Sequence, residues 1–188
     1  MHDIEPHYNW RHLYVASEDE RSPFHGYFNS EVYFTDVLYD HLIHPQWDNI
    51  GSPTLFLKIL YVNYSRGFSI IELFGEWNDL LSNDIMILKR DIIEPMIAEG
   101  IDKFILIGEN ILNMHADGTD YYEEWFEEVE DGWIALLNFR EHVIDEMTRY
   151  GLDHFLVAGG RLNELSWRSL GPEALFKKVE TLVMKRLG

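Results

Sequence analysis

The fold is decided by residues 55–74, which read LFLKILYVNYSRGFSIIELF. The first half is aliphatic, β-branched and aromatic at both alternating sets of positions, which is typical of a strand covered on both faces. Ser65-Arg66-Gly67 follows as a three-residue hairpin loop, with Gly67 at the position that needs a left-handed backbone. Phe68–Phe74 is then the return strand, so this segment predicts a buried β-hairpin.

A helix is predicted shortly after the hairpin. Ser82–Asp84 can cap its start, apolar positions follow helical spacing to about Glu99, and Gly100 is a suitable stop. Pro95 lies inside this segment and should bend the helix or split off its last turn, because proline has no backbone N–H to donate.

Two later junctions resemble each other. Residues 100–108 and 151–159 both show a helix stop, a polar turn, a buried strand and a glycine. Between them we predict an acidic helix at about 120–130 and a longer helix at about 133–150, and a last helix begins at Pro172. Strands that alternate with helices require crossover connections and hence parallel pairing. The predicted fold class is α/β, with a mixed, mostly parallel sheet that starts with a β-hairpin and is flanked by helices.

Residues 1–53 precede this α/β domain of residues 54–188 as an extension rich in aromatic side chains. A disordered tail is poor in such residues, so we expect the extension to be ordered and packed on the domain or on a second copy of the chain. Packed in that way, it could serve as the lid of a carrier for an apolar ligand. The aromatic residues are Tyr8, Trp10, Tyr14, Phe24, Tyr27, Phe28, Tyr33, Phe34, Tyr39 and Trp47.

Composition limits the classes of function. Acidic residues outnumber basic ones 33 to 15, for a net charge of −18 in 188 residues. A nucleic-acid binder needs a basic face, and anionic lipid repels an acidic chain, so we predict neither nucleic acid nor membrane as a partner. The chain has no cysteine, which excludes disulfides, thiolate catalysis and cysteine zinc sites. It shows no membrane-length apolar run and no secretory signal at residues 1–6, so we expect a cytoplasmic protein.

The predicted order of hairpin, helix, strand, helix, strand and helix resembles the anti-sigma-factor antagonist (STAS) and SpoIIAA-like group of folds. Ile70–Trp77 lies where that family has a strand ending in Gly-Glu just before its first helix, and Lys103–Ile107 matches its next strand. The resemblance covers roughly residues 55–188. It implies a STAS-like fold and a regulatory role exerted by binding another protein.

One family feature is missing from the sequence. STAS domains carry a phosphorylatable serine in an Asp-Ser-Ser-Gly turn after the strand that matches residues 103–107. Here the corresponding stretch is residues 113–120, in which Thr119 is the only hydroxyl residue. The resemblance therefore does not carry the phosphorylated serine over to this chain.

A ligand site is predicted where the strands end, because ligands of open parallel sheets bind beyond the carboxyl ends of the strands. We expect loops at residues 75–79, 108–115 and 159–163, each with polar side chains. Glycines and polar residues also serve simply to turn and cap the chain, so a structural explanation stands beside the site. The candidate ligand-binding residues are Glu76, Asn78, Asp79, Glu109, Asn110, Gly160, Arg161 and Asn163.

The chemistry of this predicted site favours an anionic small molecule. Gly159-Gly160-Arg161 can present backbone N–H groups and a guanidinium to an anion, and Glu109 or Asp79 would act as a base or a further ligand. Arg161 can instead pair with a carboxylate of the chain such as Glu109.

The acidic helix offers a second candidate site, a docking surface for a basic protein. Residues 161–188 carry six basic and three acidic residues, a charge of +3, and the rest of the chain carries −21. The basic partner is therefore either another protein or the C-terminal helix of a second copy. The alternative is a helix anchored by its apolar face with solvated charges. The candidate docking residues are Tyr122, Glu124, Trp125, Glu127 and Glu128.

No metal or cofactor site is predicted. The acids near residues 115–124 can bind a cation, but Asp120 followed by Glu123 also forms a capping box, which we favour. Dinucleotide, Walker and nucleophile-elbow motifs are absent from the sequence, so we predict no catalytic residue. We interpret the chain as a non-enzymatic regulatory or protein-interaction module that binds a protein partner or a second copy. The alternative is a small-molecule binder or enzyme that uses the three strand-end loops.

Overall fold

The computed structural model describes residues 2–34 and 36–188. Its larger sheet has five strands in the order β4-β5-β6-β7-β8. β4, β5 and β6 pair antiparallel, whereas β6, β7 and β8 pair parallel, so the predicted mixed sheet that begins with a hairpin is confirmed. The strands are β4 (Asp48–Asn49), β5 (Leu55–Asn63), β6 (Phe68–Asn78), β7 (Lys103–His115) and β8 (Trp133–Leu137).

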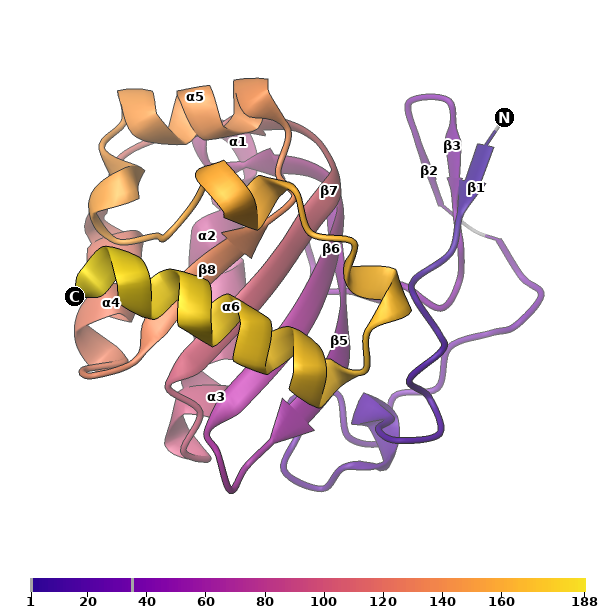
Figure 1. The fold of residues 1–188 in the computed structure, drawn as a ribbon. Coiled ribbons are helices and arrows are strands. Elements are labelled where there is room, and N and C mark those ends of the chain that lie inside the picture. The colour runs from indigo at the N-terminus through magenta and orange to yellow at the C-terminus, as the bar shows by residue number, and fades with distance from the viewer. Residues whose placement is uncertain (1, 35) are drawn as a thin grey trace.

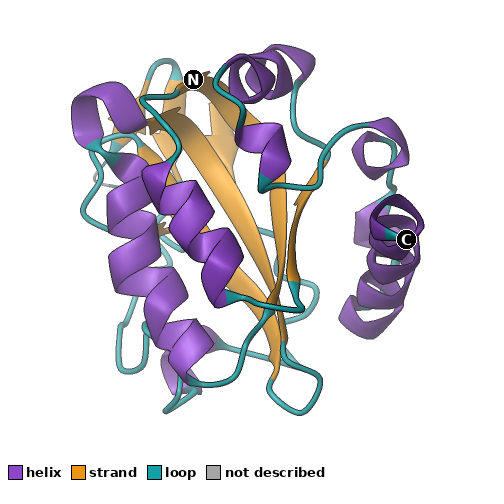
Figure 2. Ribbon diagram, turned by 90° about the vertical axis from the view of Figure 1, so that its left-hand side faces the viewer, coloured by secondary structure: helices purple, strands orange, loops and turns teal. Residues whose placement is uncertain are grey.

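Helices flank this sheet on both faces, as Figure 2 shows. One face is covered by α2 to α5 and the other by α6, and none of the described helices is long and apolar enough to cross a bilayer. The α-helices are α1 (Asp79–Ser82), α2 (Asp84–Ile87), α3 (Glu94–Ala98), α4 (Asp120–Glu128), α5 (Glu141–Arg149) and α6 (Pro172–Leu187). The other turns are η1 (Ala16–Glu18), the π-helical η2 (Leu88–Ile93), η3 (Leu152–His154), η4 (Gly160–Asn163) and η5 (Trp167–Ser169).

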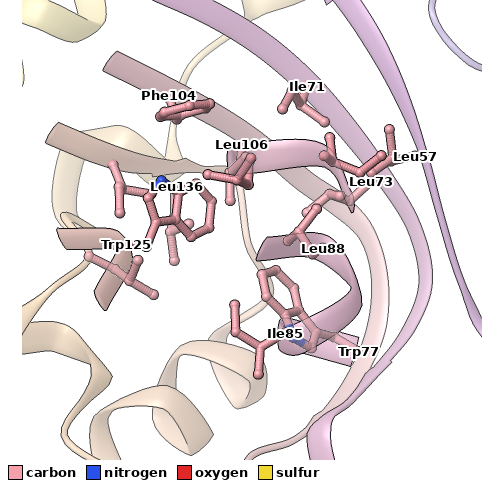
Figure 3. Close-up of a cluster of buried hydrophobic side chains, with 14 of the residues drawn as sticks. Leu57, Ile71, Leu73, Trp77, Ile85, Leu88, Phe104, Leu106, Trp125 and Leu136 are labelled. Atoms are coloured by element: carbon pink, nitrogen blue, oxygen red, sulfur yellow. The ribbon is translucent and has the colours of Figure 1, made fainter. Parts of the chain in front are cut away.

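The core on the α2–α5 face joins the hairpin to the helices. Leu73 of β6 lies close to Leu88 of η2, and Trp125 of α4 meets the ring of Phe104 of β7 edge-on at a centroid distance of 5.3 Å (Figure 3). These side chains are fully buried. Removing so much apolar surface from water is the main force that holds the helices on the sheet.

The predicted hairpin turn is present, but its loop has four residues, 64–67, instead of three, because β5 ends at Asn63 and pairs there with Phe68. The Gly67 N–H donates to the carbonyl oxygen of Asn63 at 2.8 Å, and Gly67 has a φ of 70°. The pairing of β5 with β6 shifts register between Ile59 and Tyr61, which marks a β-bulge.

Both central strands run further than the sequence pattern indicates. The expected loops at residues 75–79 and 108–115 are wrong, because β6 continues to Asn78 and β7 to His115. These two residues pair with each other in the parallel ladder. The backbone hydrogen bonds of a ladder do not depend on side-chain polarity, so polar residues can extend a strand.

The expected helix at about 133–150 is only partly correct. Residues 133–137 form β8, and the helix begins at Glu141. All five residues of β8 are buried, and a short run of this kind fits a buried strand and a buried helix equally well. Asn138 takes a left-handed conformation with a φ of 54° just after the strand.

The expected strand at residues 155–158 is reduced to a single bridge. Val157 donates to the carbonyl oxygen of Ile134 and accepts from the N–H of Leu136, both at 2.8 Å. Before it the chain forms the 3₁₀ turn η3, and after it Gly159 turns the chain away with a φ of 79°. The four residues between these turns leave room for one bridging residue only.

Pro95 disturbs its helix as expected. The N–H of Glu94 donates to the carbonyl oxygen of Lys89, five residues earlier, so the turn before the proline is π-helical. A wider turn at this point removes the clash that the proline ring makes with the carbonyl group four residues before it.

The expected capping box of the acidic helix is wrong. Asp120 is already the first helical residue, and Thr119 occupies the N-cap position without a side-chain cap. The carboxylates of Asp120 and Glu123 lie in the first turn, where the helix dipole favours them.

The N-terminal extension lies beside β5 (Figure 1) and forms a small sheet of order β1-β3-β2. Trp47 ties the extension to the main sheet, since its ring stacks on Phe74 at 5.5 Å and its Nε1 donates to the carbonyl oxygen of Ile4 at 2.6 Å. Trp10 donates from Nε1 to the carbonyl oxygen of Leu170 at 3.2 Å. The strands are β1 (His2–Ile4), β2 (Val37–Leu38) and β3 (His41–Ile43).

Gly75→Ala should destabilise the fold by at least ~2 kcal/mol. Gly75 has a φ of 114°, and an added Cβ would lie 2.0 Å from the carbonyl oxygen of Thr54. Gly171→Ala is the control, since nothing lies within 4 Å of an added Cβ there and the φ is −75°. Urea unfolding measures both variants, and equal losses of stability would contradict this account of β6.

Candidate functional site

The predicted strand-end residues fall into three groups, and the first gathers where β6 and β7 end. Glu76 Oε1 accepts from Asn78 Nδ2 at 2.9 Å and lies 3.7 Å from His115 Nε2. The hydroxyl of Tyr39 donates to the other oxygen of Glu76. The structure thus brings Glu76 and Asn78 together, with His115 and Tyr39 beside them.

Asp79, in the same group, anchors the chain after β6. Its carboxylate accepts from Trp77 Nε1 at 2.9 Å, the Ile85 N–H at 2.9 Å and the Tyr122 hydroxyl at 2.6 Å. Burial raises its pKa to about 6, and the Tyr122 hydroxyl opposes that rise. Asp79 is buried, and its oxygens join β6, the start of α2 and α4, which is a structural task.

Glu109, in the second group, has a different partner from the one expected. Its carboxylate pairs with Arg168 of η5, and Trp167 Nε1 donates to it at 3.4 Å. Arg161 instead lies exposed on η4. The expected ion pair between Arg161 and Glu109 is therefore wrong, because η5 and not η4 approaches Glu109. Asn110 follows on β7, opposite Phe74 of β6.

The third group, on η4, faces the chain's own C-terminal helix. Arg186 of α6 donates to the carbonyl oxygens of Ala158 and Gly159, and an added Cβ at Gly160 would meet that guanidinium. Asn163 is half-buried. Within the described residues, no hydrogen bond or ion pair joins the candidate residues of one group to those of another.

A buried carboxyl group that the sequence analysis missed lies in the middle of β6. Glu72 is 0% exposed, and its Oε2 accepts from the His7 N–H at 2.8 Å. Its Oε1 lies 3.7 Å from the guanidinium of Arg168, which also pairs with Glu109. We call Glu72, Glu109, Arg168 and His7 the Glu72 cluster. The signal in the sequence is a lone acid inside the apolar run of residues 70–74.

Two tryptophans pack against the His7 ring of this cluster. The imidazole of His7 packs edge-on against Trp10 at 5.0 Å and against Trp167 at 4.7 Å. Burial lowers the pKa of His7, and the nearby charge of Arg168 lowers it further. His7 is therefore neutral at pH 7, and its ring serves as a packing element.

The electrostatics of Glu72 follow from its burial, which raises the pKa of its carboxyl group to about 7. The His7 N–H and the charge of Arg168 oppose that rise because both favour the ionised form. A carboxyl group with this pKa can gain or lose a proton near neutral pH. The Glu72 cluster can thus respond to pH.

The candidate docking residues on α4 are only partly exposed. Tyr122 and Trp125 are 1% and 0% exposed, so in this conformation neither side chain can contact a partner. Both face the core because the apolar side of α4 covers the sheet.

The acidic side of α4 is partly neutralised by a buried lysine. Lys89 Nζ lies 2.6 Å from Glu128, 3.0 Å from Glu94 and 3.8 Å from Glu124. These three carboxylates are close enough together to hold a metal ion, but the ammonium group of Lys89 already lies among them. Among the candidate docking residues, Glu127 is exposed and makes none of these contacts to Lys89.

Most of the exposed large apolar side chains among the described residues lie in the extension. Phe28 is 91% exposed, Tyr33 75% and Val32 70%. We call this stretch, residues 27–34 and 36–39, the exposed aromatic segment. The aromatic content of this stretch predicted that it would be packed, but composition alone does not distinguish buried from exposed rings. Its exposed large apolar members are Tyr27, Phe28, Val32, Tyr33, Phe34, Val37 and Tyr39.

Comparison with protein-family models gives no match for the chain. No curated protein matches it either. One similar solved structure is that of the anti-sigma factor antagonist SpoIIAA in its unphosphorylated form, at 17% identity and a TM-score of 0.45 over 66% of this chain and 96% of that one. Another is the Bacillus cell fate determinant SpoIIAA in the phosphorylated form, at 15% identity and a TM-score of 0.41 over 65% of this chain and 98% of that one. Both structures come from the group that the sequence resembles, and the similarity covers part of the chain.

Glu72→Gln should change how stability depends on pH. The pKa of Glu72 is raised from 4.5 to about 7, so its contribution to stability is full below about 4.5 and is lost as the pH rises through about 7. Glutamine keeps the acceptor for the His7 N–H and cannot ionise. Relative to the wild type, the free energy of unfolding of the variant should rise by about 2 kcal/mol between ~pH 5 and ~pH 8.

Urea unfolding at the two pH values measures this difference. Glu109→Gln is the matched control, because it removes the other carboxylate of the cluster from a side chain that is 25% exposed. A Glu72→Gln variant whose stability follows pH as the wild type does would show that Glu72 is not the responsive group.

Proposed function

We propose that this chain is a non-enzymatic regulatory module that acts by binding another protein, and that the exposed aromatic segment is its docking surface. The observation that carries the proposal is the exposure of large apolar side chains there, led by Phe28 at 91%. An apolar surface of this kind is costly in water and marks an interaction site.

The composition of the segment fits a protein interface. Tyrosine and phenylalanine are enriched at such interfaces, and each buries on the order of 150–250 Å². Their rings are rigid, so ordering them on binding costs little conformational entropy. By contrast, the two aromatic residues proposed on α4, Tyr122 and Trp125, are buried in the core.

The partner should present an apolar surface flanked by basic side chains. Residues 27–40 include Glu31, Asp36 and Asp40 and contain no lysine or arginine. The net charge of −18 opposes association of this chain with itself. We therefore propose that the partner is a different protein, with basic side chains around the apolar surface that it presents.

The second function expected from the sequence, an anionic small molecule held at the strand ends, has weaker support. Its residues lie in three groups that no hydrogen bond or ion pair joins within the described part of the chain, and Arg161 faces solvent on η4. The excess of carboxylates in the first group, with Glu76 and Asp79, would repel an anion.

A double variant, Phe28→Ser with Tyr33→Ser, should weaken partner binding at least ~10-fold, because it removes two exposed rings from the proposed surface. Leu80→Ser with Leu81→Ser is the matched control, since these side chains are 60% and 82% exposed on α1. The immobilised chain is used to capture a partner, which is then purified and titrated by calorimetry against each variant.

Two results together support the proposal, namely a loss confined to the Phe28/Tyr33 double variant and an affinity that falls as salt rises. Equal affinity for the wild type and this variant would reject the docking surface. Capture of the chain by itself through the same segment would replace the proposed partner with a second copy.

A further inference from the structure

A cavity of about 240 Å³ lies between the N-terminal extension and β5. Trp10, Tyr14 and Phe24 line it from the extension, and Ile59 and Leu60 line it from β5. An apolar cavity of roughly 150 Å³ is enough to hold a benzene molecule. The present cavity therefore has room for two fused aromatic rings.

The backbone of β5 adds polar groups to this cavity. The Thr54 carbonyl oxygen accepts from the Glu76 N–H at 2.9 Å, so the backbone of Thr54 bonds to β6. Because backbone groups alternate between the two sides of an antiparallel strand, those of Leu57 and Ile59 point away from β6. On that side β4 pairs with Phe56 and Leu57 only. No backbone hydrogen bond joins the described part of the extension to Ile59, which lines the cavity.

Two side chains at the cavity wall hold polar atoms without hydrogen-bond partners among the described residues. Asp48 is 4% exposed, and its Oδ1 accepts from Asn29 Nδ2 at 2.6 Å while its Oδ2 accepts no hydrogen bond. Lys58 Nζ lies 3.5 Å from that Oδ2. His7 Nε2 is the second such atom. Asp48 Oδ2 thus has an ion-pair partner in Lys58 but accepts no hydrogen bond, and a ligand that supplies a donor to it is favoured.

The charges around the cavity distinguish between ligand classes. Acidic residues outnumber basic ones in the lining, which repels an anion and attracts a cation. The faces of the tyrosine and tryptophan rings also attract cations. The charged lining residues are Glu5, Glu18, Glu31 and Asp48 against Arg11 and Lys58.

We propose that this cavity is a binding site for a small aromatic amine. The ring lies between the aromatic side chains of the extension and Ile59 and Leu60 of β5, and the amino group donates to Asp48 Oδ2. Tyr27 and Phe28 of the exposed aromatic segment also line this cavity, whereas Asp48 lies outside that segment. Asp48→Asn therefore tests the amine site without removing an aromatic ring from the proposed docking surface, so either proposal can fail while the other stands.

Three probes that share one ring system test the ligand class. Tryptamine carries an ammonium group, indole carries no charge, and indole-3-acetate carries a carboxylate. Calorimetric titration of the full chain should give saturable binding in the order tryptamine, indole, indole-3-acetate. Tryptamine should bind at least ~10-fold more tightly than indole-3-acetate, a difference of about 1.4 kcal/mol.

Two variants place the binding in this cavity. Asp48→Asn should weaken tryptamine at least ~10-fold and leave indole unchanged, because it removes only the charge that the amine meets. Glu123→Gln removes the same charge from an exposed position on α4 and should change neither. Ala16→Leu fills space at the cavity wall, where Ala16 is 2% exposed, and should weaken all three probes.

Several outcomes would overturn the proposal. The site is rejected if the wild type binds none of the three probes saturably, or if Asp48→Asn and Ala16→Leu, both shown to be folded by thermal unfolding, bind tryptamine as the wild type does. Tighter binding of indole-3-acetate than of tryptamine would reject the amine.

Discussion

The burial of β6 on both faces is the constraint on which the rest of the structure depends. Ten of its eleven residues are buried, so both faces of the sheet must be covered along the full length of the strand. On one face α2 to α5 provide a continuous cover. On the other face α6 covers only the part around Phe68 and Ile70, and the extension covers the part around Phe74 with Trp47. Glu72 lies where these two covers meet.

This division explains why the polar chemistry of the sheet is concentrated at one place. A boundary between two apolar clusters is where a charged side chain can be enclosed and still reach a partner. Glu72 reaches the backbone of His7 from the extension and the guanidinium of Arg168 from η5. Both covers thus touch the same carboxyl group, and the protonation of Glu72 depends on how closely they meet.

The aromatic residues of the extension have three different roles. Trp10 and Trp47 are buried and fix it to the main sheet. Tyr14 and Phe24 form the wall of a cavity. Phe28 and Tyr33 face solvent and remain free to contact another molecule. An aromatic-rich composition is compatible with each task, which is why composition alone did not separate them.

Sequence patterns predicted the parts of the fold that local physics determines. The hairpin followed from the apolar run of residues 55–63 and from Gly67, and the disturbed helix followed from Pro95. The strand at Trp133–Leu137 was missed because five buried residues show no period. The arrangement of the Glu72 cluster could not be predicted from the sequence. Arg168 and Glu109 are 59 positions apart and meet only because η5 packs on the sheet, which no local pattern encodes.

The edges of the larger sheet are covered by very little paired backbone. β4 contributes two residues alongside β5, and Val157 contributes one bridge alongside β8. The rest of the outer edge of β5 is shielded by side chains of the extension. Without that shield, a nine-residue strand in which seven residues are aliphatic or aromatic would present unpaired N–H and C=O groups to solvent. Such a strand is a template for intermolecular β-pairing and fibril growth. The packing of the extension, anchored by Trp10 and Trp47, therefore also protects this edge from pairing with another chain.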